Sequence, residues 1–211
     1  MESAAQQLMV LALRLNRAHR PSRGTTPKNV RFAPLFLMTD PVRTPDPVLA
    51  AARLPRGAGV IYRHFGAPDR AVTARRLAHI CRKRRLTLLI AADPALAWQV
   101  RADGVHWPER LLKPGRPRKG VVSAAVHGAA GLKKAAAAGA DLALLSSIFP
   151  SRSPSAGKPL GPARARALIR DAKLPVYALG GVNSRNARLL ARSGFAGLAA
   201  IDGLVSCETS A

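Results

Sequence analysis

The chain has 211 residues, 48% of them hydrophobic, which is enough for one folded domain with a substantial core and argues against a disordered chain. It carries 34 Lys and Arg against 11 Asp and Glu, a net charge of +23. No apolar stretch reaches the ~18 uncharged residues of a membrane span, no convincing secretory signal opens the sequence, and two cysteines are too few for a disulfide framework, so we expect a cytoplasmic globular protein without a membrane partner.

Residues 1–33 differ in composition from residues 34–211, and we treat the two as separate segments. Ala4 to Leu15 has the pattern of an amphipathic helix, and an Arg-rich stretch with Pro and Gly follows it. Two interpretations stay open for this extension: an arm that binds anionic surfaces or serves as a transit-like segment, or an added helix that caps a barrel end and continues into a loose tail. The main domain is expected to span residues 34–211.

From residue 35 onward, short apolar runs alternate with helical patterns. The apolar runs are Leu35–Asp40, Gly59–Phe65, Thr87–Asp93, Gly104–Trp107, Val121–Val126, Leu142–Phe149, Pro175–Gly181 and Phe195–Asp202. Helical patterns lie at Pro45–Leu54, Arg70–Arg84, Pro108–Leu112, Ala129–Ala138, Pro162–Ala172 and Ser184–Ser193. Runs buried on both faces and joined by crossover helices indicate parallel strands. Eight of them predict an α/β fold, a compact (β/α)8 TIM barrel with an N-terminal helical extension.

Functional side chains of such a barrel lie where the strands end, on the βα loops. Gly180 and Gly181 follow the seventh strand and precede a helix expected from Ser184, so backbone N–H groups there can approach an anion closely, although a Gly pair is equally typical of a structural turn. The loop after the sixth strand offers hydroxyls and cations, a composition that is also typical of a mobile loop. The residues concerned are Ser151, Arg152, Ser153 and Lys158.

Two histidines lie on predicted strands or at their ends. His127 follows the fifth strand, where a neutral imidazole can transfer protons near neutral pH. His106 lies inside the fourth strand, which favours a structural role. No pair of His or Cys has the spacing of metal ligands, and the sequence contains neither a P-loop nor a nucleophile elbow.

The strand ends taken in order resemble the thiamine phosphate synthase/TenI family over roughly residues 34–205. The matching segments are Leu35–Asp40, Gly59-Val60 with Arg63, Ala102–His106, His127 with an Ala-rich helix, Gly139–Asp141, Phe149–Ser153, Pro159–Gly161, and Pro175-Val176 with Gly180–Val182. The resemblance implies a barrel of thiamine biosynthesis or salvage that joins a pyrimidine pyrophosphate to a thiazole phosphate. It also implies Mg²⁺, held by two aspartates, as the cofactor of the synthase.

Carried over residue by residue, the resemblance assigns catalytic roles to His127 and to Arg63 on the second strand. It assigns thiazole-phosphate binding to Ser151, Arg152, Ser153, Lys158, Gly180, Gly181, Ile201 and Asp202. The metal ligands do not carry over, because the family's Asn-Asp pair falls on Ala91-Ala92 and its second aspartate on Leu111. Magnesium requires hard oxygen ligands, and Asp93 and Glu109, each close in sequence, are candidate substitutes, although strand alternation points Asp93 in a different direction from Ala92. Asp202 itself replaces a serine and places a carboxylate beside the expected phosphate.

Several functions therefore stay open. A synthase with altered ligands would require Mg²⁺ and both substrates, whereas a TenI-like tautomerase would use His127 for a proton shift on a thiazole phosphate without metal. A non-catalytic binding or regulatory barrel would hold an anionic partner through its arginines, and another phosphate-binding barrel enzyme would rest on the Gly pair alone. The net charge admits nucleic acid, but an aromatic content of 4% offers few stacking platforms for single strands. A homo-oligomer is also left open.

Overall fold

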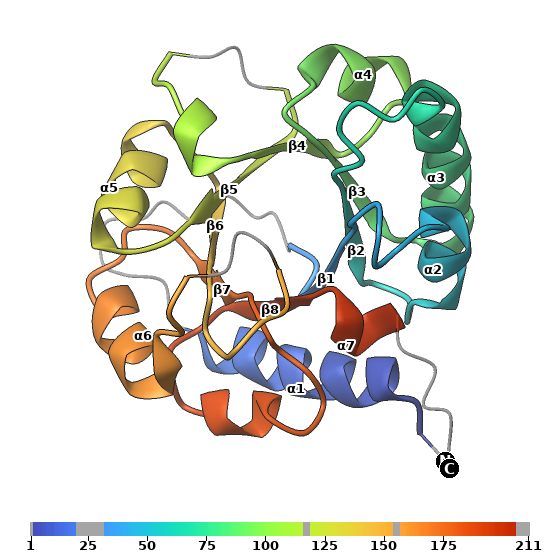
Figure 1. Cartoon of the computed structure of the whole chain (residues 1–211). Coiled ribbons are helices and arrows are strands. Elements are labelled where there is room, and N and C mark those ends of the chain that lie inside the picture. Colours follow the sequence, from blue (N-terminus) through green and yellow to red (C-terminus); the bar gives the residue numbers. More distant parts are fainter. Residues whose placement is uncertain (1, 20–31, 116–118, 154–156, 206–211) are drawn as a thin grey trace.

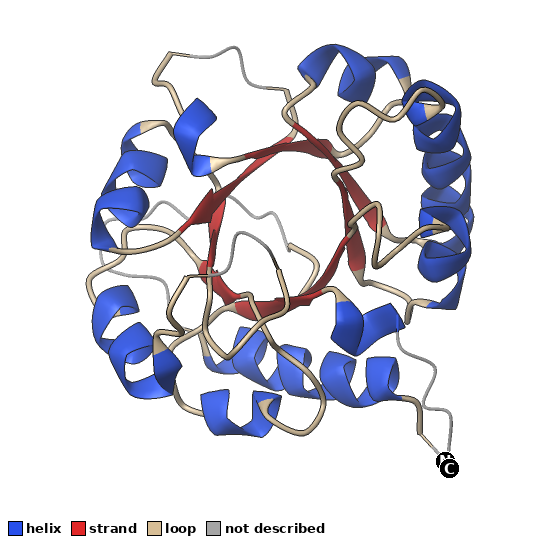
Figure 2. Cartoon of the chain, viewed as in Figure 1, coloured by secondary structure: helices blue, strands red, loops and turns tan. Residues whose placement is uncertain are grey.

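The computed structural model describes residues 2–19, 32–115, 119–153 and 157–205. Within these ranges eight parallel strands pair in sequence order, and β1 also pairs with β8, which closes the barrel (Figures 1 and 2). The strands are β1 Leu35–Met38, β2 Gly59–Tyr62, β3 Thr87–Ala91, β4 Gly104–Trp107, β5 Val121–Val126, β6 Leu142–Leu145, β7 Val176–Ala178 and β8 Gly197–Ala200. The predicted (β/α)8 barrel is confirmed.

Helices form the outer ring around these strands (Figure 2). They are α1 Ala4–Ala18, α2 Pro47–Arg53, α3 Arg70–Arg84, α4 Pro94–Gln99, α5 Ala129–Ala137, α6 Gly161–Ile169 and α7 Asp202–Val205, with the 3₁₀ turns η1 Glu109–Leu111 and η2 Ala187–Leu190. Among the described residues, no helix has the length and apolarity that crossing a bilayer requires.

The N-terminal helix α1 packs beside β8 and β1 on the outside of the barrel (Figure 1). It begins at a capping box in which Ser3 and Gln6 each accept a hydrogen bond from the other's backbone N–H. Its apolar stripe is buried, and Asn16 Nδ2 donates to the Ala196 carbonyl at 2.9 Å. The predicted Arg-rich tail at residues 20–31 lies outside the described residues.

Helix α4 and the segment after β7 are two of the places where the structure differs from the sequence-based expectation. Helix α4 was not expected between β3 and β4; Asp93 starts it by accepting from the Leu96 N–H at 2.9 Å. The helix expected over Ser184–Ser193 is wrong, since only the short turn η2 forms there. Asn183 Oδ1 accepts hydrogen bonds from the backbone N–H groups of Arg185 and Asn186. Such side-chain hydrogen bonds compete with the backbone hydrogen bonds of a helix.

The barrel interior is filled by apolar side chains below its open end. Phe36 and Tyr177 meet there edge to face, with ring centroids 5.9 Å apart. Gly59 and Gly197 make room for them, because a Cβ at Gly59 would overlap the Phe36 ring and one at Gly197 would overlap the Tyr177 ring. A ligand can therefore enter only above this layer, at the carboxyl ends of the strands.

This packing predicts that Gly197→Ala destabilises the barrel, because the added methyl group forces the Tyr177 ring to move within a filled interior. We expect the free energy of unfolding to fall by about 1–3 kcal/mol in urea denaturation. Gly157→Ala is the matched control, since its Cβ would meet open space. Equal stability of the two variants would show that the interior adjusts freely.

Candidate functional site

A cavity of about 920 Å³ opens at the carboxyl ends of the strands. Its volume lies in the range typical of small-molecule sites, ~300–1,000 Å³. Every strand except β3 contributes to its wall through its last residues or the loop that follows it. The cavity is therefore at the place where TIM barrels carry their chemistry.

Most of the residues expected to form the site line this cavity. They are Arg63, Glu109, His127, Ser151, Arg152, Ser153, Gly180, Gly181, Ile201 and Asp202. Two expected residues do not line it: Lys158, which is exposed on the loop after β6, and Asp93, which caps α4. Sequence reasoning also missed Arg43, which lines the cavity from the loop after β1.

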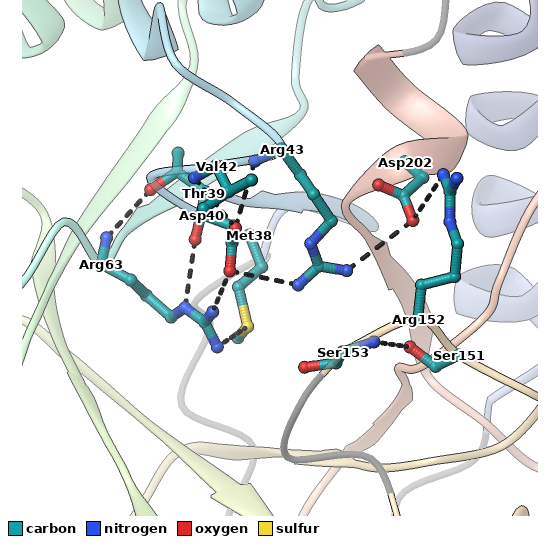
Figure 3. Close-up of polar contacts among 10 residues, drawn as sticks. All are labelled: Met38, Thr39, Asp40, Val42, Arg43, Arg63, Ser151, Arg152, Ser153 and Asp202. Carbon is teal, nitrogen blue, oxygen red and sulfur yellow. Dashed lines mark hydrogen bonds and ion pairs between the residues drawn. The ribbon is translucent and has the colours of Figure 1, made fainter.

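Asp40 and two arginines form an ion-pair cluster at the β1–β2 side of the cavity (Figure 3). Asp40 Oδ2 accepts from Arg43 Nη2 and from Arg63 Nη2, both at 3.2 Å. The Arg63 side chain is also held by the Thr39 carbonyl, which accepts from Nε at 3.1 Å. Its Nη1 donates to the sulfur of Met38 at 3.4 Å, a weak acceptor. The carboxylate thus orients both guanidinium groups.

Asp202 extends this cluster across the mouth to the loop after β6 (Figure 3). Its Oδ2 lies 3.7 Å from Arg43 Nη1 and 3.4 Å from Arg152 Nη2. Arg152 is 80% exposed, whereas Arg43 is 15% exposed, so the two pairs differ in how strongly water screens them. Asp202, which we expected beside a bound phosphate, is therefore paired with two arginines.

Burial and neighbouring charges act in opposite directions in this cluster. Burial raises the pKa of Asp40, but hydrogen bonds from Arg43 and from backbone N–H groups outweigh it, and the pKa lies below its usual value. Burial lowers the pKa of Arg63. The positive charge of Arg43 lowers this pKa further, whereas the negative charge of Asp40 raises it. Asp40 is thus ionised at neutral pH.

The loops after β6 and β7 form the opposite wall. Gly180 and Gly181 have φ of 91° and 66°, the left-handed region that favours glycine. A Cβ at Gly180 would lie 2.7 Å from Ser147 Oγ, and one at Gly181 would overlap the Pro150 carbonyl. Only glycine lets these two loops approach so closely. The wall that results presents backbone and the hydroxyl groups of Ser151 and Ser153.

His127 lines the cavity at the end of β5, beside the end of β6. Its Nδ1 is 3.3 Å from both the carbonyl oxygen and the Oγ of Ser146. When Nδ1 carries the proton and donates to the carbonyl, Nε2 keeps a lone pair and can accept a proton. The backbone N–H of His127 donates to Glu109 Oε2 at 2.9 Å, which fixes the position of the residue.

His106 reaches the cavity from inside the barrel, where it is 2% exposed. Its Nδ1 lies 2.9 Å from Ser123 Oγ. Burial, with Arg63 adding to it, lowers the pKa of His106 to about 3. The ring is therefore a neutral group that can form a hydrogen bond at the floor of the cavity.

The described residues do not fit a Mg²⁺ ion. The side chains of Ala91, Ala92 and Leu111 offer no oxygen, and Ala92 has φ of 54°, a conformation that Asn and Asp adopt more readily. Asp93 caps α4 and lies 4.0 Å from Arg70 Nε, outside the cavity lining. The Glu109 carboxylate accepts from a backbone N–H and is the one acidic group left on that side. No group of three potential ligands forms anywhere in the described ranges.

Comparison with known proteins identifies a family and several relatives of this chain. The family described as thiamine monophosphate synthase (TMP-TENI) matches residues 41–204. The thiamine-phosphate synthase of Alcanivorax borkumensis is 36% identical over 82% of this chain and 86% of its own, and that of Marinobacter nauticus is 32% identical over 89% of each chain. The solved structure of thiamine phosphate pyrophosphorylase from Pyrococcus furiosus, 24% identical, shares the fold with a TM-score of 0.68 over 82% of this chain and 88% of its own.

The burial of His106 predicts that its imidazole stays neutral from pH 8 down to about pH 4, because its folded pKa is about 3. The unfolded chain binds this proton near pH 6.5, so the residue contributes stability that is full above that pH and is lost as the pH falls toward 3. A ¹⁵N NMR titration of the His106 ring checks this prediction. The Ser123→Ala variant assigns the ring signals, because it removes the hydrogen-bond partner of Nδ1. A titration midpoint near 6.5 would contradict the buried position.

Proposed function

The chain belongs to the thiamine phosphate synthase/TenI family and has a role in thiamine biosynthesis, and from this premise we propose that its cavity binds a thiazole phosphate and transfers a proton on it. The observation that supports this most is the convergence of His127 with a hydroxyl- and glycine-lined wall in one cavity whose carboxylates do not fit a metal. The chemistry is then that of a metal-independent tautomerase.

The phosphate would lie against the wall formed by the loops after β6 and β7. Ser151 and Ser153 supply hydroxyl donors, and Gly180 and Gly181 allow backbone N–H groups to come close to the anion. Arg152 supplies a cation on the same side. Ile201 lines the cavity next to this wall and gives the thiazole ring an apolar surface.

His127 would then lie beside the heterocycle rather than beside the phosphate. With Nδ1 donating to the Ser146 carbonyl, Nε2 takes a proton from one carbon attached to the ring system and returns it at another. The shift breaks one C–H bond, forms another and needs no co-reactant. Neither a metal nor a pyrimidine takes part.

Coupling of the thiazole phosphate to a pyrimidine pyrophosphate is a second candidate function. Arg43 and Arg63 favour it, because they add two cationic side chains to the lining of the cavity besides Arg152. The relatives named as thiamine-phosphate synthases point the same way. In such enzymes Mg²⁺ neutralises the departing pyrophosphate, and the described residues offer no group of three potential ligands to hold the ion.

The binding proposal predicts that thiazole phosphate binds at least about tenfold more tightly than the unphosphorylated thiazole alcohol, because the wall forms charge-assisted hydrogen bonds. Isothermal titration calorimetry checks this. The Ser151→Ala/Ser153→Ala double variant should lose most of the difference. Lys158→Ala is the control on the same loop and should keep it; if instead only Lys158→Ala binds weakly, the phosphate does not lie on this wall.

His127→Gln should bind thiazole phosphate nearly as well as the parent chain but interconvert its tautomers about 10²-fold more slowly, the usual loss of a general base. NMR of the substrate measures the interconversion. Unchanged turnover in the variant would remove His127 from the chemistry.

The coupling of the two substrates is tested in an experiment of its own. Purified protein given pyrimidine pyrophosphate and thiazole phosphate should form little thiamine phosphate by mass spectrometry, with Mg²⁺ or with chelator. Product that requires Mg²⁺ would mean that carboxylates such as Glu109 or Asp202 rearrange to hold the ion.

A further inference from the structure

The end of the barrel opposite the cavity carries a dense group of positive side chains. Here the last residues of α2, α3 and α4 lead into the amino ends of β2, β3 and β4. Hydrogen bonds join these three segments: Arg84 Nη2 donates to the Leu54 carbonyl at 2.9 Å, and Arg82 Nη1 donates to the Val100 carbonyl at 3.2 Å. We call the exposed cations of the three segments the basic end; they are Arg53, Arg56, Arg82, Lys83, Arg85 and Arg101.

Negative charge does not balance the basic end. The one carboxylate on the same segments is that of Asp103, and its Oδ2 accepts a hydrogen bond from the Leu88 N–H at 2.7 Å. Among the described residues, no ion pair joins a cation of the basic end to a carboxylate. Repulsion among these cations opposes folding, and a bound polyanion would relieve it.

The outer face of α3 extends the positive charge along the side of the barrel. Arg75, Arg76, His79, Arg82 and Lys83 are exposed and lie three or four residues apart, as residues on one face of a helix do. The helix dipole favours cations in the last turn but does not account for Arg75 and Arg76. Since α3 contains no acid, no pair of opposite charges along the helix offsets them.

An exposed aromatic ring lies beside the basic end. Trp98 is on α4, two residues before Val100, whose carbonyl accepts the hydrogen bond from Arg82 (Figure 1). Its side chain is 67% exposed, whereas the other tryptophan, Trp107, is 8% exposed. Lys119 Nζ lies 3.5 Å from the centroid of the Trp98 ring, over one of its faces. A planar apolar ring surrounded by cations can stack on a nucleobase while the cations bind the adjoining phosphates.

From this arrangement we infer that the basic end, the outer face of α3 and Trp98 form a binding surface for single-stranded nucleic acid. The guanidinium groups bind phosphate oxygens, and Trp98 stacks on an unpaired base. An acidic peptide or an anionic membrane offers negative charge without a base, and a duplex keeps its bases paired inside, so the exposed ring favours the single strand. The surface lies at the opposite end of the barrel from the cavity, and the inference does not depend on the proposed function.

The test is fluorescence anisotropy of a labelled thymidylate strand of about 20 nucleotides, titrated with the full chain at about 50 to 200 mM salt. Affinity should fall as salt rises. The Arg75→Gln/Arg76→Gln/Lys83→Gln variant should bind more weakly, and the slope of log affinity against log salt should become shallower by about 2, because each phosphate contact on a single strand contributes about 0.7. These three side chains have no hydrogen-bond or ion-pair partner within the described ranges, so the fold does not depend on them.

The matched control is Arg164→Gln/Arg166→Gln/Arg188→Gln, which removes the same charge from exposed positions of α6 and η2. Helix α6 lies across the barrel from α3 (Figure 1). This variant should bind the strand as the parent chain does. Equal weakening in the two triple variants would overturn the inference, because the attraction would then follow from the net charge of +23 and not from this surface.

Trp98→Ala separates base stacking from attraction between charges. It should bind the strand about fivefold or more weakly, with the same salt slope, because one stacked base is lost and no phosphate contact is lost. It should bind inorganic polyphosphate, which has no bases, as the parent chain does. Unchanged affinity of Trp98→Ala for the strand would contradict the inference. So would binding to vesicles rich in phosphatidylserine by a chain that does not bind the strand.

Discussion

Closure of eight short parallel strands into one ring is the constraint that places every functional side chain of this protein. The eight barrel strands are three to six residues long and mostly buried on both faces, and side chains such as Phe36 and Tyr177 fill the interior below the mouth. Where these strands end, the described residues line a cavity of about 920 Å³. Residues as distant in the sequence as Asp40 and Asp202 become neighbours there because β1 pairs with β8.

The aspartates at that mouth are paired with arginines, and the cavity lining as a whole carries more cationic side chains than carboxylates. Three arginines and two aspartates alternate from β2 to the loop after β6, and Asp40 is held ionised by its hydrogen bonds from Arg43 and the backbone. In this family a bound metal would bring positive charge to the same region. The resemblance places the metal aspartates of the family on Ala92 and Leu111, whose side chains offer no oxygen, whereas Arg43 and Arg63 add positive charge elsewhere in the cavity.

The fold was predictable because buried runs and crossover helices leave a regular pattern in the sequence. The ends of the strands were predictable for the same reason, which is why His127, Arg63 and Gly180 all line the cavity. Arg43 was not predictable, since its significance arises from pairing with Asp202 across the β1–β8 seam. Nor could composition show that Lys158 lies outside the lining, because that depends on the path of its loop.

The most direct test of this account is a crystal structure of the protein with thiazole phosphate and Mn²⁺, with manganese located by its anomalous scattering. The account predicts phosphate density against Ser151 and Gly181, the thiazole ring beside His127, and no manganese peak in the cavity. A manganese peak coordinated by Glu109, Asp40 or Asp202 would contradict it, because those carboxylates would then be metal ligands rather than partners of arginines and backbone.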